Sequence, residues 1–160
     1  MTDAREGLSH LDASGHAHMV DVSGKDISAR SARASGRVLL SAEAIAALRA
    51  GRVPKGDALA VARIAGIQGA KRTPDLIPLC HPIALHAVTV DLEVQDDAVA
   101  IVAKARTADR TGVEMEALTA VAVAALALID MVKAVDPAAV ISDVRVEEKT
   151  GGKTGQWRRP

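Results

Sequence analysis

The chain of 160 residues has no Phe and no Tyr, and its single Trp stands at position 157, close to the C-terminus. Hydrophobic residues nevertheless make up 49% of the sequence. A buried core therefore has to be built from Ala, Val, Leu and Ile. The same absence argues against an RNA-binding sheet, because such sheets stack bases on aromatic side chains.

Cysteine is equally scarce. Cys80 is the only one, so no disulfide can form within the chain. The N-terminus is polar and has no apolar run of the signal-peptide type. The apolar stretch 117–129 is shorter than the ~20 residues needed to cross a bilayer, which favours a buried helix. We therefore expect a cytoplasmic protein that has no contact with a membrane.

The net charge does not indicate a binding partner, because 20 basic residues balance 20 acidic ones. The distribution is more informative. Residues 30–72 contain nine Lys or Arg and only two acidic residues, a composition suited to binding anions. A solvated basic surface that is balanced by acids elsewhere in the fold remains the alternative.

The order of predicted elements favours an α+β fold. Strands are expected at 36–40, 88–94, 99–105 and 141–147, helices at 42–50, 58–71 and 112–135, and a stiff extended connector at 76–83. This order suits one antiparallel sheet with helices packed on one face. We interpret it as a ferredoxin-like split βαβ arrangement with one additional helix.

The ends of the chain differ from its middle. Residues 1–30 are rich in Ser, Gly, His and Asp with little periodicity, and they predict a mobile N-terminal arm. Residues 31–155 form a single catalytic domain in this interpretation, and residues 156–160 form a C-terminal tail. No internal repeat or linker divides the domain.

Asp130 and Lys133 are three residues apart on the long predicted helix and share one face of it. An ordinary surface ion pair, worth ~0.5 kcal/mol, is the plain explanation. However, the helix carries no charge from 117 to 129, so the pair follows a strongly apolar segment. This isolation predicts a partly desolvated acid and amine, whose shifted pKa values suit proton transfer.

Glu114 and Glu116 stand at the start of the same helix, where the helix dipole favours negative charge. Glu116 and Asp130 are 14 residues apart, which corresponds to roughly 21 Å along a helix. Within one subunit the two carboxyls cannot act on one atom. Either they contact opposite ends of a long ligand, or a neighbouring subunit completes each site.

Cys80 and His81 lie on the Pro-flanked connector. Neighbouring residues in an extended segment point to opposite faces, which argues against a Cys-His nucleophile pair. We interpret His81 as a residue that hydrogen-bonds the ligand or carries a proton. A metal site at His16, His18 and Asp21 is a weaker alternative, and no metal ligands are assigned.

Lys55 precedes a predicted helix N-terminus, where backbone N–H groups and the helix dipole attract phosphate. Lys149 and Lys153 stand in a glycine-rich segment near the C-terminus. Together these lysines suggest a site for a polyphosphate. The segment is not a P-loop, because it lacks the GxxxxGK[ST] spacing. Taken singly, each lysine is more often just solvated.

These residues occur in motifs that resemble the cyclic pyranopterin monophosphate synthase family of molybdenum-cofactor biosynthesis. The matching motifs are HMVDV at 18–22, KGD at 55–57, ARIAGIQ at 62–68, AKRT at 70–73, DLIPLCHP at 75–82, TGVEMEALT at 111–119, DMVKAV at 130–135 and KTGGKTG at 149–155. They cover about residues 18–155. The joint occurrence of LCHP, GVEMEALTA and DMxKAV is highly specific.

The resemblance implies a lyase that converts 3′,8-cyclo-7,8-dihydroguanosine 5′-triphosphate into cyclic pyranopterin monophosphate and releases diphosphate. It implies Asp130 and Lys133 as the catalytic pair. The substrate-binding residues that it implies are Lys55, Leu79, Cys80, His81, Met115, Glu116 and Lys149. It also implies a ferredoxin-like homohexamer, a trimer of dimers with sites at subunit boundaries. No cofactor is assigned, and Mg²⁺ accompanying the triphosphate stays open.

Two other classes of protein remain to be tested beside the enzyme. One is the RNA-binding module that the missing aromatics argue against. The other is a small regulatory or assembly domain that binds a nucleotide without chemistry, which release of diphosphate from the cyclised nucleotide would exclude.

Overall fold

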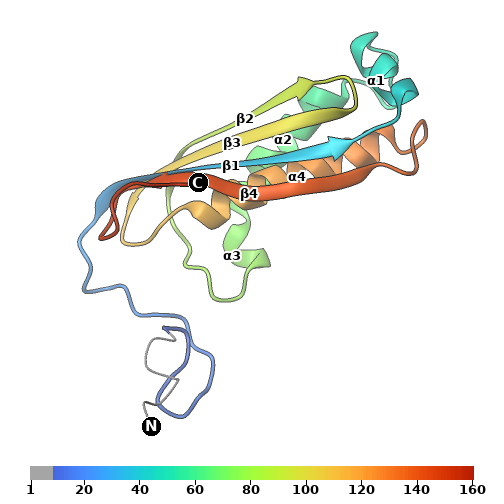
Figure 1. The fold of residues 1–160 in the computed structure, drawn as a ribbon. Helices are drawn as coiled ribbons and strands as arrows, with labels where there is room; N and C mark the ends of the chain where they lie inside the picture. Colours follow the sequence, from blue (N-terminus) through green and yellow to red (C-terminus); the bar gives the residue numbers. More distant parts are fainter. Residues whose placement is uncertain (1–8) are drawn as a thin grey trace.

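The computed structural model describes residues 9–160 (Figure 1). The strands are β1 (Ser28–Leu39), β2 (Leu85–Val94), β3 (Ala98–Asp109), β4 (Val140–Thr150) and β5 (Trp157–Arg158). The helices are α1 (Ala42–Arg49), α2 (Ala58–Lys71), α3 (Thr73–Leu76) and α4 (Glu114–Val132).

The strands form one antiparallel sheet in the order β2-β3-β1-β4-β5. The helices α2 and α4 lie side by side on one face of this sheet, and α1 lies beyond its end (Figure 1). The predicted α+β, ferredoxin-like fold with helices on one face is confirmed.

The central strand β1 is longer than its sequence suggested. We predicted a strand only from residue 36, yet β1 begins at Ser28, inside the segment expected to be a mobile arm. Its N-terminal half alternates buried Ala32 and Ala34 with Ser and Arg on the other face. Alanine has a low preference for strands, so this period of two was not recognised. The first eight residues of the expected arm lie outside the described residues.

Two further segments differ from the predictions. Residues 73–76 form the short helix α3 with Pro74 in its first turn, and a turn at Pro78 and Leu79 interrupts the connector that we expected to be extended. At the C-terminal end, β4 continues through Lys149 and Thr150, which were predicted to be loop. The tail then returns as β5, whose two residues pair with β4.

The core is aliphatic, as the composition predicted. Its largest fully buried side chains include Ile101, Leu128 and Val38, whereas Trp157 is 39% exposed. By length and composition, α4 could cross a membrane. However, its side chains form much of the core between the sheet and α2, as in a helix that packs inside a protein core.

The two long helices approach each other closely at Gly66 in α2. A Cβ atom at this position would lie 2.8 Å from the carbonyl oxygen of Ala120 and 3.1 Å from the Cβ of Ala124, both in α4. A backbone oxygen cannot move aside as a flexible side chain can. Glycine therefore allows α2 and α4 to pack at this distance.

We predict that Gly66→Ala lowers the free energy of unfolding by about 1–2 kcal/mol, because the overpacking outweighs the helix preference of Ala. Urea denaturation would measure the change. Gly24→Ala is the matched control, since nothing lies within 4 Å of a Cβ there, and it should change stability by less than about 0.5 kcal/mol. A Gly66→Ala variant as stable as the control would contradict the packing argument.

Candidate active site

The residues singled out from the sequence gather at the two ends of α4. Asp130, Lys133 and Lys55 meet at its C-terminal end. The remaining predicted residues lie near its N-terminal end. The length of α4 holds Glu116 and Asp130 roughly 21 Å apart, as the sequence indicated.

At the C-terminal end, two lysines share one carboxylate. Lys133 Nζ donates a hydrogen bond to Asp130 Oδ1 at 2.7 Å, and Lys55 Nζ donates one to Asp130 Oδ2 at 3.1 Å. Lys55 reaches this position from the loop before α2, where Gly56 has a φ of 108° and Asp57 caps the helix. The hydrogen bonds from Lys133 and then Lys55 hold the pKa of Asp130 below its usual range. Asp130 is therefore ionised at neutral pH.

The prediction that Asp130 and Lys133 are partly desolvated is wrong for the single chain. Their side chains are 55% and 58% exposed. Met131 and Val132 of this last turn are buried in the core, whereas Asp130 and Lys133 lie on its solvent-facing side. Within one chain, this pair differs from a simple surface ion pair in that a second lysine, Lys55, shares the carboxylate.

At the N-terminal end of α4, five predicted residues line one hollow of about 290 Å³. The connector supplies Leu79, Cys80 and His81, and the first turn of α4 supplies Met115 and Glu116. The structure thus brings these residues together, as the sequence predicted, although 36 positions separate Cys80 from Glu116. Residues of the N-terminal segment, including Val20, Val22 and Lys25, complete the wall.

Glu116 is the most perturbed carboxyl in this hollow. Only 3% of the residue is exposed, and burial, with a contribution from the Glu114 charge, raises its pKa to about 7. Burial and the Glu116 charge also raise the pKa of the Cys80 thiol. The hollow therefore holds a carboxyl that can exchange a proton near neutral pH and a thiol that stays protonated there.

Lys149 lies in a small adjoining hollow of about 60 Å³. Its Nζ pairs with Glu114 Oε1 at 2.8 Å, and Glu114 lines both hollows. Arg30 of β1 also lines the small hollow, and its guanidinium lies against Gly152, where a Cβ atom would clash with it. Arg30 and Glu114 were not assigned to the site from the sequence. The antiparallel pairing of β1 and β4, which places Arg30 near Lys149, was the missing information.

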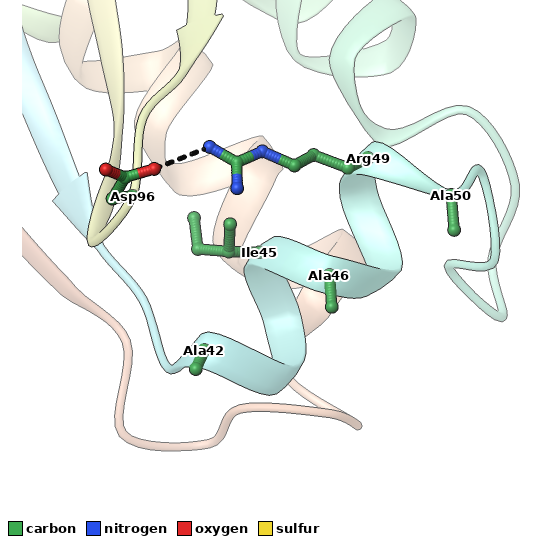
Figure 2. A pocket seen from close by; sticks show the side chains of 6 residues that line it. All are labelled: Ala42, Ile45, Ala46, Arg49, Ala50 and Asp96. Carbon is green, nitrogen blue, oxygen red and sulfur yellow. Dashed lines mark hydrogen bonds and ion pairs between the residues drawn. The ribbon is translucent and has the colours of Figure 1, made fainter.

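Another hollow, of about 460 Å³, lies on α1 and the β2-β3 turn (Figure 2). It is lined by Ala42, Ile45, Ala46, Arg49, Ala50 and Asp96. Its only charged groups are Arg49 and Asp96, which form an exposed ion pair at 2.9 Å. It contains none of the residues that the sequence assigned to chemistry.

Among residues 9–160, no group of three or more His, Cys, Asp and Glu side chains is placed to hold a metal ion. This includes the weaker alternative at His16, His18 and Asp21. A carboxylate between two lysines and a basic hollow beside a buried glutamate are features of an enzyme that binds an anionic small molecule.

Comparison with known proteins identifies the class. The sequence profile of the MoaC family matches residues 19–152, and the chain belongs to this family. It is 69% identical over 98% of its length to a cyclic pyranopterin monophosphate synthase of Streptomyces avermitilis, of which 92% is covered. It is 64% identical to the enzyme of the same name from Nocardioides sp., with both chains fully covered. It is 57% identical over 99% of its length to the cyclic pyranopterin monophosphate synthase 2 of Mycobacterium tuberculosis, of which 95% is covered.

The raised pKa of Glu116 predicts a specific pH dependence of stability. A carboxyl whose pKa rises from 4.5 to about 7 on folding stabilises the protein fully below pH 4.5, and this contribution is lost as pH rises through about 7. Relative to Glu116→Gln, the wild type should lose roughly 1–3 kcal/mol of unfolding free energy over that interval. Denaturant titrations of both proteins at several pH values would measure it. A constant difference would contradict the assignment.

Proposed function

We propose that this chain converts 3′,8-cyclo-7,8-dihydroguanosine 5′-triphosphate into cyclic pyranopterin monophosphate and releases diphosphate, an early step of molybdenum-cofactor biosynthesis. Membership of the MoaC family and the names of its relatives support this activity. The observation that carries the proposal is the Asp130 carboxylate held between Lys133 and Lys55. This group combines a proton acceptor with two cations within a few ångströms.

In this proposal, Asp130 and Lys133 move protons while the purine-derived ring opens and rearranges. Asp130 is ionised and can accept a proton, and the adjacent ammonium can donate one. Lys55 and Lys133 also place positive charge where a triphosphate or a departing diphosphate would carry negative charge. Such fixed charges stabilise the leaving group without reorganisation.

Glu116 would serve as the complementary acid. Its pKa of about 7 lies far from that of Asp130, which the lysines lower. Two carboxyls whose environments push their pKa values apart can act as acid and base at one pH. Leu79, Cys80, His81 and Met115 would then surround the ring system, and Lys149 would bind phosphate beside them.

Bringing the two ends of α4 to one substrate requires a second subunit. We propose a cytoplasmic homohexamer, a trimer of dimers, in which Asp130 of one subunit faces Glu116 of another. The outer surface of the helical layer supports an interface, because Val61 and Ile64 on α2 and Leu126 on α4 are 42%, 59% and 59% exposed. Exposed apolar side chains on two neighbouring helices are consistent with a surface that packs against another subunit.

We also propose that any Mg²⁺ used in the reaction enters with the triphosphate as part of the substrate. This ion keeps several waters and is usually held through substrate phosphates and one or two carboxylates. Exposed carboxylates such as Asp130 could complete such a coordination without a preformed protein cage.

We predict that Asp130→Asn and Lys133→Ala lower kcat for the cyclised nucleotide by roughly 10²–10⁴-fold, the usual contribution of general acid-base catalysis. Diphosphate release and pterin formation would be measured together. Asp96→Asn is the control, since it removes the charge of another exposed, ion-paired aspartate away from the site (Figure 2). Wild-type turnover by Asp130→Asn would exclude the proposed role. Binding of the nucleotide without diphosphate release by the wild-type protein would instead support a regulatory domain.

If each active site combines residues of two subunits, two inactive variants should complement each other. Asp130→Asn and Glu116→Gln should each be inactive alone, whereas unfolding them together and refolding an equal mixture should restore about a quarter of the wild-type activity, because that fraction of composite sites receives both native residues. Separately refolded proteins that are mixed afterwards are the control. No recovery in mixed oligomers would show that one subunit supplies both residues.

A further inference from the structure

The N-terminal segment is attached to the domain by unusually few bonds. Among the described residues, residues 9–27 form backbone hydrogen bonds only with one another, for example from His18 N to His10 O and from Lys25 N to Val22 O. Within the described part of the chain, two side chains of the domain bind this segment. His81 Nε2 lies 2.5 Å from the carbonyl oxygen of Val20, and Arg110 Nε donates to the carbonyl oxygen of Lys25 at 3.0 Å.

The segment between these two bonds forms a wall of the candidate active site. Val20, Val22 and Lys25 line the hollow that contains Glu116. Residues 19–23 also line a second hollow, of about 490 Å³. Hollows lie on both sides of the segment, and only Val20 and Val22 among residues 9–27 are half-buried, so little packing holds it. Its position over Glu116 therefore depends on His81 and Arg110.

The bond at His81 also determines the form of the imidazole. A carbonyl oxygen only accepts hydrogen bonds, so Nε2 must carry the proton that is shared with Val20. The neutral ring in this arrangement is the Nε2–H tautomer. Since Nε2 is already bonded to the segment, it is not free to bond a reacting atom of the substrate.

We propose that His81 is a positioning residue that fastens residues 19–25 over the candidate active site, and that it does not move a proton in the reaction. The kinetic effect of this role rests on the proposed function, whereas the attachment of the segment by His81 does not. By holding Val20 and Val22 against the hollow, His81 excludes water from Glu116 and retains the substrate. A wall that contacts the substrate equally in the ground state and the transition state contributes uniform binding, so its loss raises KM more than it lowers kcat.

Two substitutions of His81 separate positioning from proton transfer. The side-chain amide nitrogen of Gln reaches the place of Nε2, so His81→Gln keeps a donor for Val20 but cannot titrate. The amide nitrogen of Asn falls short of it, so His81→Asn loses the bond. Hydrogen-deuterium exchange of residues 19–25 in the substrate-free protein reports the attachment, and KM and kcat for the cyclised nucleotide report its consequence.

We expect faster exchange at residues 19–25 in His81→Asn, and exchange close to wild type in His81→Gln. His81→Asn should raise KM about tenfold while changing kcat less than threefold, and His81→Gln should restore KM. Arg110→Gln, which weakens the second attachment at Lys25, should also speed exchange. The exchange measurement needs no turnover, so it stays decisive if the proposed reaction is wrong.

Two results would overturn the proposal. Unchanged exchange at residues 19–25 in His81→Asn would show that His81 does not hold the segment. A fall in kcat of about 10²-fold or more in His81→Gln, with exchange as in the wild type, would show that His81 transfers a proton.

Discussion

The close packing of α4 against the sheet and α2 is the constraint on which the rest of the structure depends. Ala117, Ala120 and Ala124 are fully buried along this helix, and Gly66 faces it from α2. Small residues let the helix axis lie close to its neighbours. At such close packing, the addition or loss of one methyl group changes the stability of the fold. A helix held this firmly fixes the distance between the side chains at its two ends. Glu116 and Asp130 are therefore positioned by the core as much as by their own contacts.

The two ends of α4 give their carboxyls opposite properties. Glu116 lies where the helix enters the core, and burial raises its pKa to about 7. Asp130 lies on the exposed side of the last turn of the helix, and hydrogen bonds from Lys133 and Lys55 lower its pKa. Desolvation and hydrogen bonding thus shift the same chemical group in opposite directions. One rigid element supplies a candidate acid and a candidate base, and symmetry between subunits can bring them together.

The parts of the fold that the sequence predicted are those with a strong local signal. Strand β2 alternates Val and Leu with polar residues, and α4 is a long apolar run, so both were recognised. Strand β1 was predicted too short because its buried positions before residue 36 are Ala32 and Ala34, which carry little strand signal. The short strand β5 depends on pairing with β4 and has no signal of its own.

The same distinction applies to the site. The residues around Glu116 belong to motifs that are recognisable in the sequence, and the structure gathers them in one hollow. The contact of Lys55 with Asp130 spans 75 positions and could not be predicted from spacing. Arg30 was seen only as part of a basic segment, because its place beside Lys149 follows from strand register. The fold determines long-range neighbours of this kind, and no local sequence pattern encodes them.

The lysines proposed to bind phosphate at the two ends of α4 are already paired with carboxylates of the chain. Lys55 and Lys133 share Asp130, and Lys149 pairs with Glu114. An ammonium has three N–H donors, so each lysine can still bind a phosphate oxygen, but its carboxylate partner already neutralises part of its charge. A singly charged ligand therefore gains little at these lysines, whereas a polyphosphate offers several charged oxygens and gains at each contact. In the proposed reaction, each lysine keeps a carboxylate partner when diphosphate leaves, which favours release. The internal ion pairs would thus favour a highly charged ligand and assist the departure of its leaving group.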